Sequence, residues 1–270
     1  MTTYTHHKNR ACLGISGPDA GAFLQSTLTQ DVESLQKNTL SYAAHLSPQG
    51  KMLYDFFIAK TEERYILDCE RDDLMPLAKT LHSFVVSKKV VFEDLSDDYL
   101  VLTTTTPPED SFMHCMQDNR HTDMGWRIWA TTAEYDAVEK DSDTTTYTEK
   151  RISLVIPEND GIQNKTLINE LNFERIGGVS FNKGCYVGQE LTARTKFRTE
   201  PKKRLFYVTF ETTETLAKGT PIMAETTEVG WLMSNLKGKG IALLRLRYED
   251  KQNLTVEGAP LHIHYRDDTA

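Results

Sequence analysis

Cys185 stands in a setting that could do thiol chemistry. It lies between Gly184 and Tyr186, with Lys183 two residues before it and Gly188 three residues after it. Glycine permits a tight backbone approach or a positive φ, and lysine and arginine near a helix opening favour the reactive thiolate. The setting predicts a reactive or ligand-binding cysteine, although a lone cysteine can also be an inert, partly buried small hydrophobe.

This cysteine lies in a strongly positive segment. Residues 183–204 hold seven basic and two acidic side chains, a local charge of +5, in a chain whose net charge is -8, so the remaining residues together carry -13. Such a segment concentrates an anionic ligand at one place, although solvated charges flanking a linker would give the same pattern. Its charged residues are Lys183, Glu190, Arg194, Lys196, Arg198, Glu200, Lys202, Lys203 and Arg204.

The remaining cysteines and histidines do not form a recognisable metal site. Cys12, Cys69 and Cys115 are far apart and lack the paired spacing of a zinc site or a disulfide framework, a pattern typical of a reducing compartment. His262 and His264 share one face of an expected strand, but no third ligand accompanies them, so we expect no stably bound metal. Walker A, GxGxxG and GxSxG motifs are absent, which disfavours nucleotide hydrolysis and hydride transfer.

The composition indicates a folded, soluble protein. With 270 residues, 39% hydrophobic and 26% charged, the chain differs from a collagen, a disordered acidic tail and a small disulfide scaffold. Its negative charge disfavours a surface that coats nucleic acid, and no run of about 18 apolar residues predicts a membrane span. The polar N-terminus does not resemble a secretory signal. We expect a cytoplasmic protein of bacterial type, or a processed mitochondrial matrix protein.

Two helices and several strands are expected before residue 200. The best-supported helix covers residues 71–86, because Leu74, Leu77 and Leu81 recur on one helical face. A second helix is expected over residues 19–35 and a polar surface loop over residues 141–148. The expected strands cover residues 51–60, 64–69, 90–92, 99–102 and 126–129. This order favours a layered α+β domain.

Beyond residue 200 the pattern changes to short strands separated by glycine turns. Strands are expected over residues 205–210, 230–233, 241–246 and 261–265. Regular spacing of this kind predicts a small β-barrel or sandwich. We therefore expect a boundary near Glu200 and Pro201, with domains 1–200 and 201–270 and a possible subdomain seam near residues 141–149.

The residues around Cys185 resemble a known signature. The string from Lys183 to Glu190, KGCYVGQE, is similar to the motif of the YgfZ-type folate-binding proteins, relatives of the glycine cleavage T-protein that support iron-sulfur cluster assembly. The resemblance extends to residues 170–173, 178–181 and 191–194, to residues 23–25, 29, 31–32, 47–51 and 55 near the N-terminus, and to residues 240–245. Ser26 and Thr27 depart from the glycine-containing pair that the family pattern has after Gln25.

The resemblance implies an α+β, T-protein-like fold, with a folate-binding region of two ferredoxin-like halves and a small C-terminal antiparallel β-barrel. It implies a tetrahydrofolate-binding accessory factor for assembly, repair or maturation of [4Fe-4S] proteins, without stand-alone catalytic activity. Its partners would be folate and iron-sulfur client or scaffold proteins. A cluster held by this chain alone would need about four thiolates.

The resemblance also implies roles for particular residues. Cys185 acts at the partner face, Glu170 meets the pterin edge with support from Asn172, and Asp55 faces the folate, although Asp55 could equally be an edge-strand carboxylate pointing to water. The glutamate tail would meet Arg194, Lys196 and Arg198, and the motif residues Lys183, Tyr186, Gln189 and Glu190 complete the expected cofactor site.

Two other functions remain open at this point. One is a folate-dependent aminomethyltransferase or demethylase like the T-protein itself, although this chain is shorter and carries the cysteine motif. The other is a tRNA-modification helper that uses the basic segment, for which the chain's overall negative charge gives little support.

Overall fold

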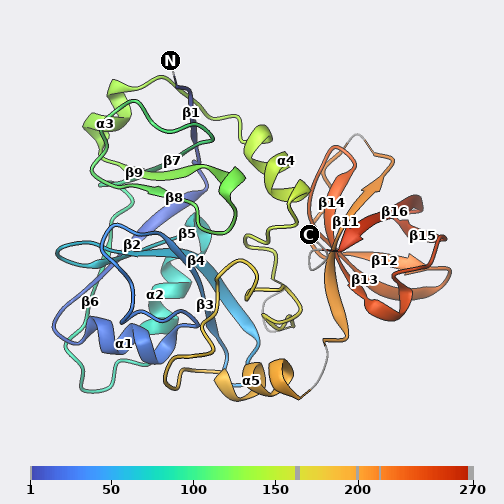
Figure 1. Ribbon diagram of the computed structural model, residues 1–270, viewed down its shortest axis with the longest axis horizontal. Coiled ribbons are helices and arrows are strands. Elements are labelled where there is room, and N and C mark those ends of the chain that lie inside the picture. Colours follow the sequence, from blue (N-terminus) through green and yellow to red (C-terminus); the bar gives the residue numbers. More distant parts are fainter. Residues whose placement is uncertain (1, 162–164, 199–200, 213, 267–270) are drawn as a thin grey trace.

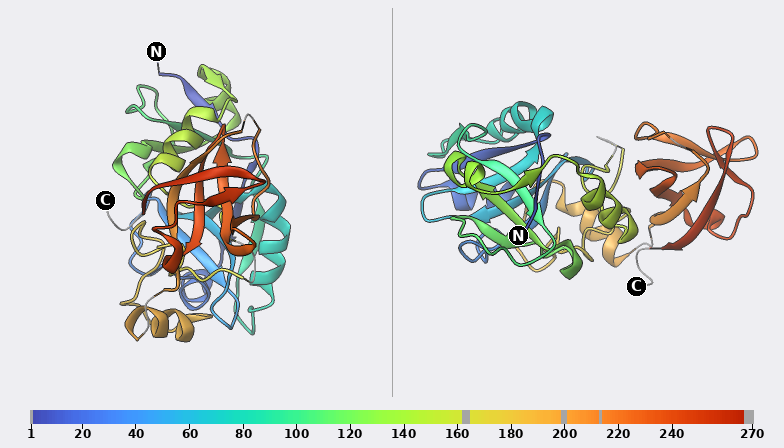
Figure 2. Two further views of the ribbon diagram at one scale, coloured as in Figure 1. Left: turned by 90° about the vertical axis from the view of Figure 1, so that its right-hand side faces the viewer. Right: turned by 90° about the horizontal axis from the view of Figure 1, so that it is seen from above.

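The protein is built from three β-sheets. The computed structural model describes residues 2–161, 165–198, 201–212 and 214–266. This part of the chain forms two five-stranded sheets and one closed barrel. Figure 1 shows the two sheets together, with the barrel standing to one side of both. Figure 2 shows α4 (Thr145–Ser153) and α5 (Gln189–Phe197) on the side of the sheets that faces the barrel.

The first sheet has the strand order β3-β4-β5-β2-β6, and all its strands except the largely exposed edge strand β6 are buried on both faces. In β4, Phe56 and Ile58 pack with helices α1 and α2, whereas Phe57 and Ala59 pack on the opposite side. Alternate residues of a strand face opposite ways, so Asp55 lies on the side away from the helices. The elements are β2 (Arg10–Ser16), α1 (Ala20–Thr27), β3 (Ser41–Leu46), β4 (Met52–Lys60), β5 (Tyr65–Glu70), α2 (Leu74–His82) and β6 (Val91–Asp94).

The expected strands of this sheet are confirmed, and both helices are shorter than predicted. Helix α1 ends at Thr27 because the hydroxyls of Ser26 and Thr27 bond back to the Phe23 carbonyl, 2.8 and 2.9 Å away, and Leu28 is extended. Residues 71–73 form a 3-10 turn before α2, which ends at His82. The buried face of α2 consists of Leu74, Leu77 and Leu81, as its periodicity predicts.

The second sheet has the order β10-β1-β7-β9-β8. Its strands are β1 (Tyr4–His6), β7 (Leu100–Thr104), β8 (Cys115–Gln117), β9 (Trp126–Ala130) and β10 (Lys140–Asp141), with α3 (Thr132–Ala137) between the last two. Strands expected over residues 99–102 and 126–129 correspond to β7 and β9. The short strands β1, β8 and β10 were not predicted, since β1 and β10 are completed by pairing with distant parts of the chain and β8 is a three-residue strand paired with β9.

The prediction of a surface loop over residues 141–148 is wrong, because α4 begins at Thr145. The four threonines of residues 141–148 have low helix propensity, so the segment resembles a loop. Tertiary packing overrides that preference: Tyr147, Arg151 and Ile152 are buried along one face. The helix packs against β13 (Thr227–Leu236) and β14 (Lys239–Arg245) of the barrel, so the expected seam contains a helix that contacts both parts of the molecule.

The barrel closes in the order β11-β14-β13-β12-β15-β16, and all its described pairings are antiparallel. Phe206, Val208, Leu232 and Leu244 are buried in its core. The four predicted strands are confirmed, whereas β12 and β15 were not predicted. The strands are β11 (Lys203–Phe210), β12 (Thr220–Ala224), β13 (Thr227–Leu236), β14 (Lys239–Arg245), β15 (Leu254–Val256) and β16 (Ala259–Arg266).

Candidate functional site

Lys183 anchors the motif loop to the end of α1. Its ammonium donates hydrogen bonds to the carbonyls of Gln25, Leu28 and Gln30, at 2.7, 2.8 and 2.6 Å. Carbonyls at and beyond a helix C-terminus lack intrahelical donors, and a lysine can supply them. The three bonds commit Lys183 to holding the loop in place.

Two glycines bring the motif into contact with the turn at residues 47–50. Gly188 is the N-terminal cap of α5 and has φ +80°; a Cβ there would lie 2.6 Å from the Ser47 carbonyl oxygen and 3.0 Å from the Gly50 Cα. Real Cβ atoms do not approach other atoms so closely. The two segments that resemble the family therefore form one unit, and glycine permits their close backbone contact.

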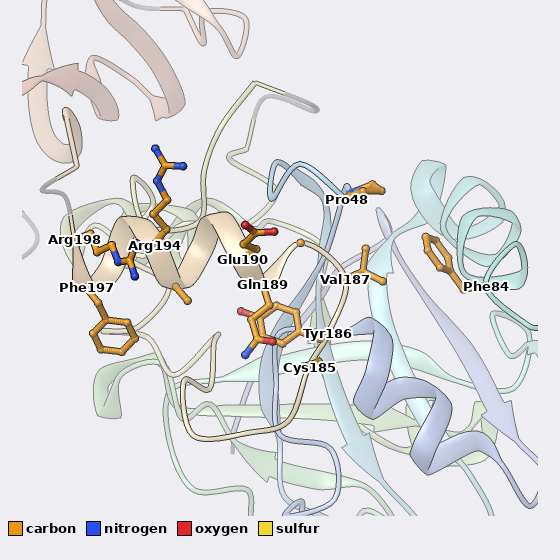
Figure 3. Close-up of a pocket in the computed structure, with 12 residues that line it drawn as sticks. Pro48, Phe84, Cys185, Tyr186, Val187, Gln189, Glu190, Arg194, Phe197 and Arg198 are labelled. Atoms are coloured by element: carbon orange, nitrogen blue, oxygen red, sulfur yellow. The ribbon is translucent and has the colours of Figure 1, made fainter.

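Cys185 lines an open groove of about 910 Å³, hereafter the cysteine groove (Figure 3). It is the exposed member of the four cysteines; Cys12 and Cys69 are buried and Cys115 is half-buried. Figure 3 shows Tyr186 and Gln189 near Cys185, with Phe197 and Arg198 at the far end of α5. The lining residues are Pro48, Phe84, Cys185, Tyr186, Val187, Gly188, Gln189, Glu190, Ala193, Arg194, Phe197 and Arg198.

The walls of the cysteine groove combine apolar side chains with cations. Phe197 is 69% exposed and packs edge-to-face with Phe181, and Phe84 lies across the groove. Arg194 and Arg198 add positive charge, opposed in the lining by Glu190. An exposed thiol beside apolar and cationic side chains suits contact with another macromolecule better than enclosure of a small cofactor.

Asp55 lies in a different cavity, of about 470 Å³, hereafter the Asp55 cavity. One Asp55 oxygen accepts hydrogen bonds from the Tyr42 hydroxyl and from the Asn159 backbone N–H, the latter at 2.8 Å. Burial raises the pKa of Asp55, while these two hydrogen bonds lower it. Trp231 from the barrel lines the same cavity, as do Lys165 and Lys218.

Glu170 is buried beside the Asp55 cavity but is not part of its described lining. Its carboxylate accepts a hydrogen bond from the Leu167 N–H at 3.2 Å and lies 4.0 Å from the Lys203 ammonium. That ammonium in turn lies 4.1 Å from the centre of the Trp231 ring. Lys203 thus connects Glu170 to an aromatic wall of the cavity.

The other predicted folate contacts lie elsewhere. Asn172 and Lys196 line a small cavity of about 200 Å³, and Lys196 forms an ion pair with Glu174. Arg194 and Arg198 face the cysteine groove. The structure therefore divides most of the predicted site residues among three cavities, leaves Glu170 and Lys183 outside these linings, and brings none of these three cations to the lining of the Asp55 cavity.

A buried network of charges, which was not predicted, joins the two sheets. Asp68 of β5 accepts hydrogen bonds from Arg10, Arg127 and the Trp129 indole, all fully or almost fully buried. Burial raises the pKa of Asp68, but its ion pairs with Arg10 and Arg127 outweigh burial and lower the pKa to about 2. The signal was present in the sequence, because charged residues inside the apolar runs YILDC and WRIWA need buried partners.

No metal centre or membrane span is found in the described part of the chain. Among those residues, no group of three or more His, Cys, Asp or Glu side chains could hold a metal ion. His264 forms a hydrogen bond with Thr209 at 2.8 Å instead. None of the described helices is long and apolar enough to cross a membrane.

Comparison with known proteins defines the class. The glycine cleavage system aminomethyltransferase T from Bartonella henselae has a similar structure, with a TM-score of 0.75 over 98% of this chain and 85% of that one. At 14% identity this likeness shows the fold alone. The GCVT N-terminal domain family matches residues 8–144, and the CAF17 C-terminal beta-barrel domain family matches residues 202–267. The chain thus has the T-protein fold with a C-terminal six-stranded barrel.

Sequence relatives define the family within this class. The mitochondrial iron-sulfur cluster assembly factors IBA57 of Mus musculus and Homo sapiens are each 30% identical to this chain, over 94% of it and 78% of their own length. A homologue from Mycosarcoma maydis is 33% identical over 75% of this chain, which spans 56% of that longer protein. The chain belongs to the IBA57 family of iron-sulfur cluster assembly factors.

Proposed function

We propose that this protein binds tetrahydrofolate in the Asp55 cavity and uses Cys185 to contact an iron-sulfur cluster held by a partner during assembly of [4Fe-4S] proteins. The observation that carries the proposal is the position of Cys185, an exposed thiol in a groove whose described lining shares no residue with that of the Asp55 cavity. Two sites with different chemistry suit a folate-binding accessory factor that acts on a second protein.

The thiol contributes one ligand to a shared cluster. Cubane clusters are held by about four thiolates, and the described residues place no second cysteine in the groove lining with Cys185. The other ligands therefore come from a scaffold or client protein. The apolar side chains Pro48, Phe84 and Phe197 around the thiol favour burial of a protein surface.

The Asp55 cavity has the groups that a reduced folate needs. A pterin presents hydrogen-bond donors on one edge, and a buried carboxylate such as Asp55 accepts them. Trp231 offers an aromatic wall, and Lys165 and Lys218 offer cations for the carboxylates of the glutamate tail. We assign the tail to these two lysines in place of Arg194, Lys196 and Arg198, because only the lysines line this cavity. Glu170 supports the aromatic wall of this cavity through Lys203, whose ammonium lies between the Glu170 carboxylate and the Trp231 ring.

The relatives' names also bear on location. The IBA57 proteins above are named mitochondrial. This supports the organellar alternative for this chain, where client and scaffold proteins would be those of the mitochondrial matrix.

The role of the thiol is tested by complementation. In cells depleted of the protein, Cys185→Ser is expected to leave [4Fe-4S] enzyme activity at the level of the empty vector, while [2Fe-2S] enzyme activity in the same extract is unchanged. Cys115→Ser is the matched control, since it removes a thiol outside the groove. Full [4Fe-4S] activity with Cys185→Ser at equal protein level would exclude a cluster contact by this thiol.

A further inference from the structure

Residues 158–160, hereafter the 158–160 segment, bind elements from all three sheets. Glu158 accepts hydrogen bonds from the Arg120 guanidinium at 2.7 Å and from the Tyr147 hydroxyl at 2.6 Å. Burial opposes the ionised form of Glu158, but Arg120 and its neighbours hold the pKa well below its usual range. This carboxylate therefore ties the segment to the second sheet region and to α4.

Asn159 connects the segment directly to Asp55. Its backbone N–H donates to the Asp55 carboxylate at 2.8 Å, and its carbonyl accepts from the Lys218 ammonium at 2.7 Å. The residue has φ 51°, a left-handed conformation that asparagine adopts more readily than most residues. The backbone of this one residue thus holds the buried acid through its N–H and a barrel-loop lysine through its carbonyl.

Asp160 fixes the barrel. One of its oxygens accepts from the backbone N–H and the hydroxyl of Ser234, at 2.7 and 2.6 Å. The other accepts from Arg151 at 2.8 Å and from the Glu158 N–H at 3.1 Å. Asp160 is fully buried, so these four donors replace all its water contacts.

The segment also lies between two cavities. Asn159 and Lys218 line both the Asp55 cavity and an adjoining polar cavity of about 290 Å³. Ser234 lies on β13, the strand that carries Trp231 into the Asp55 cavity. Asp160 is therefore bonded to Ser234 on the strand of Trp231, and it follows Asn159, whose N–H donates to Asp55.

We infer that Asp160 is a positioning residue for ligand binding: it holds the Asn159 N–H on Asp55 and the Trp231 strand against the cavity, so that folate binding and barrel docking are coupled. The inference rests on the proposed function. Coupling of this kind is reciprocal, so a bound ligand stabilises the docked barrel as much as docking strengthens binding.

Ser234→Ala is the primary test. It removes the hydroxyl that donates to Asp160 and accepts from Arg151, and it keeps the backbone N–H. Asp160→Asn comes second to Ser234→Ala, because it removes the carboxylate partner of the buried Arg151 and so destabilises the fold as a whole. In calorimetry with tetrahydrofolate, we expect Ser234→Ala to raise the Kd roughly five- to tenfold, as loss of about one buried hydrogen bond implies.

A pH profile separates positioning from general destabilisation. The N–H bond lowers the pKa of Asp55, so a loosened segment moves the acid-side midpoint of binding to higher pH. Deuterium exchange of β13 amides is expected to slow on ligand binding in the unmodified protein and much less in Ser234→Ala. The groups facing Asp55 are Tyr42 from β3, Arg10 from β2, Glu70 from β5, Asn159 and Asp160 from the segment, and Asp73, Lys165 and Lys218 around the cavity.

Thr209→Ala is the matched control, since it removes another barrel hydrogen bond, to His264, on strands that do not line the cavity. It is expected to bind tetrahydrofolate as the unmodified protein does. Equal Kd and pH midpoint in Ser234→Ala and Thr209→Ala would overturn the inference while leaving folate binding intact. Absence of binding by the unmodified protein would overturn the folate proposal itself, and the inference with it.

Discussion

The close contact at Gly188 leads to a sharp prediction about the cysteine motif. Gly188→Ala places a Cβ 2.6 Å from the Ser47 carbonyl oxygen and 2.9 Å from the Leu46 Cβ, in a residue with φ +80°. The left-handed conformation costs a non-glycine residue about 1–2 kcal/mol. Overpacking against backbone adds about 1–3 kcal/mol. We therefore expect the free energy of unfolding to fall by about 2–5 kcal/mol.

Gly184→Ala is the control within the same motif. A Cβ at Gly184 meets nothing within 4 Å, and its φ is not positive. This change is expected to alter the free energy of unfolding by less than about 0.5 kcal/mol. Both glycines lie within three residues of Cys185, so position in the sequence does not explain a difference between them.

Urea unfolding at neutral pH measures the loss, and the reaction rate of the Cys185 thiol with a disulfide reagent reports the loop position. Gly188→Ala is expected to change that rate, because the loop must move off the turn at residues 47–50, whereas Gly184→Ala preserves it. Equal stability and equal thiol reactivity in the two variants would refute the argument that Gly188 is required for the contact between motif and turn.

Two further predictions concern the buried acids. Asp68→Asn is expected to lower the free energy of unfolding by about 3–5 kcal/mol, because Arg10 and Arg127 lose their carboxylate partner; exposed Asp97→Asn is the control. The pKa of Asp68 is about 2 in the fold against an ordinary 3.8. Its ionised form therefore contributes roughly 2 kcal/mol to the free energy of unfolding above pH 4, and this contribution is lost as the pH falls towards 2. If the difference in unfolding free energy between Asp68→Asn and the unmodified protein stays constant over this pH range in urea titrations, the assignment is contradicted. Asp55→Asn is expected to weaken tetrahydrofolate binding about tenfold by calorimetry, as loss of a charged hydrogen bond to the ligand implies, and unchanged affinity would place the pterin elsewhere.

Much of the fold follows from local patterns. The strands β4 and β5 and the buried face of α2 have periodicities that their own residues reveal. The barrel strands β11, β13, β14 and β16 are marked by apolar alternation and glycine turns. Helix α4 was not predicted, because its threonines disfavour a helix. Packing against the barrel stabilises the helix, and that contact is not visible in the local sequence.

The sequence by itself determined which residues we propose for the chemistry: a cysteine inside the motif KGCYVGQE, and a positive segment around it. Only the tertiary structure decided how those charges are used. Lys183 is bound by three carbonyls and Lys196 by Glu174, while Arg194 and Arg198 face the groove beside Cys185. The net charge of a segment adds up all its charged side chains. A binding site depends instead on which of those side chains remain unpaired at one place. That is settled by contacts between distant residues, such as Asn159 on Asp55, which no local pattern contains.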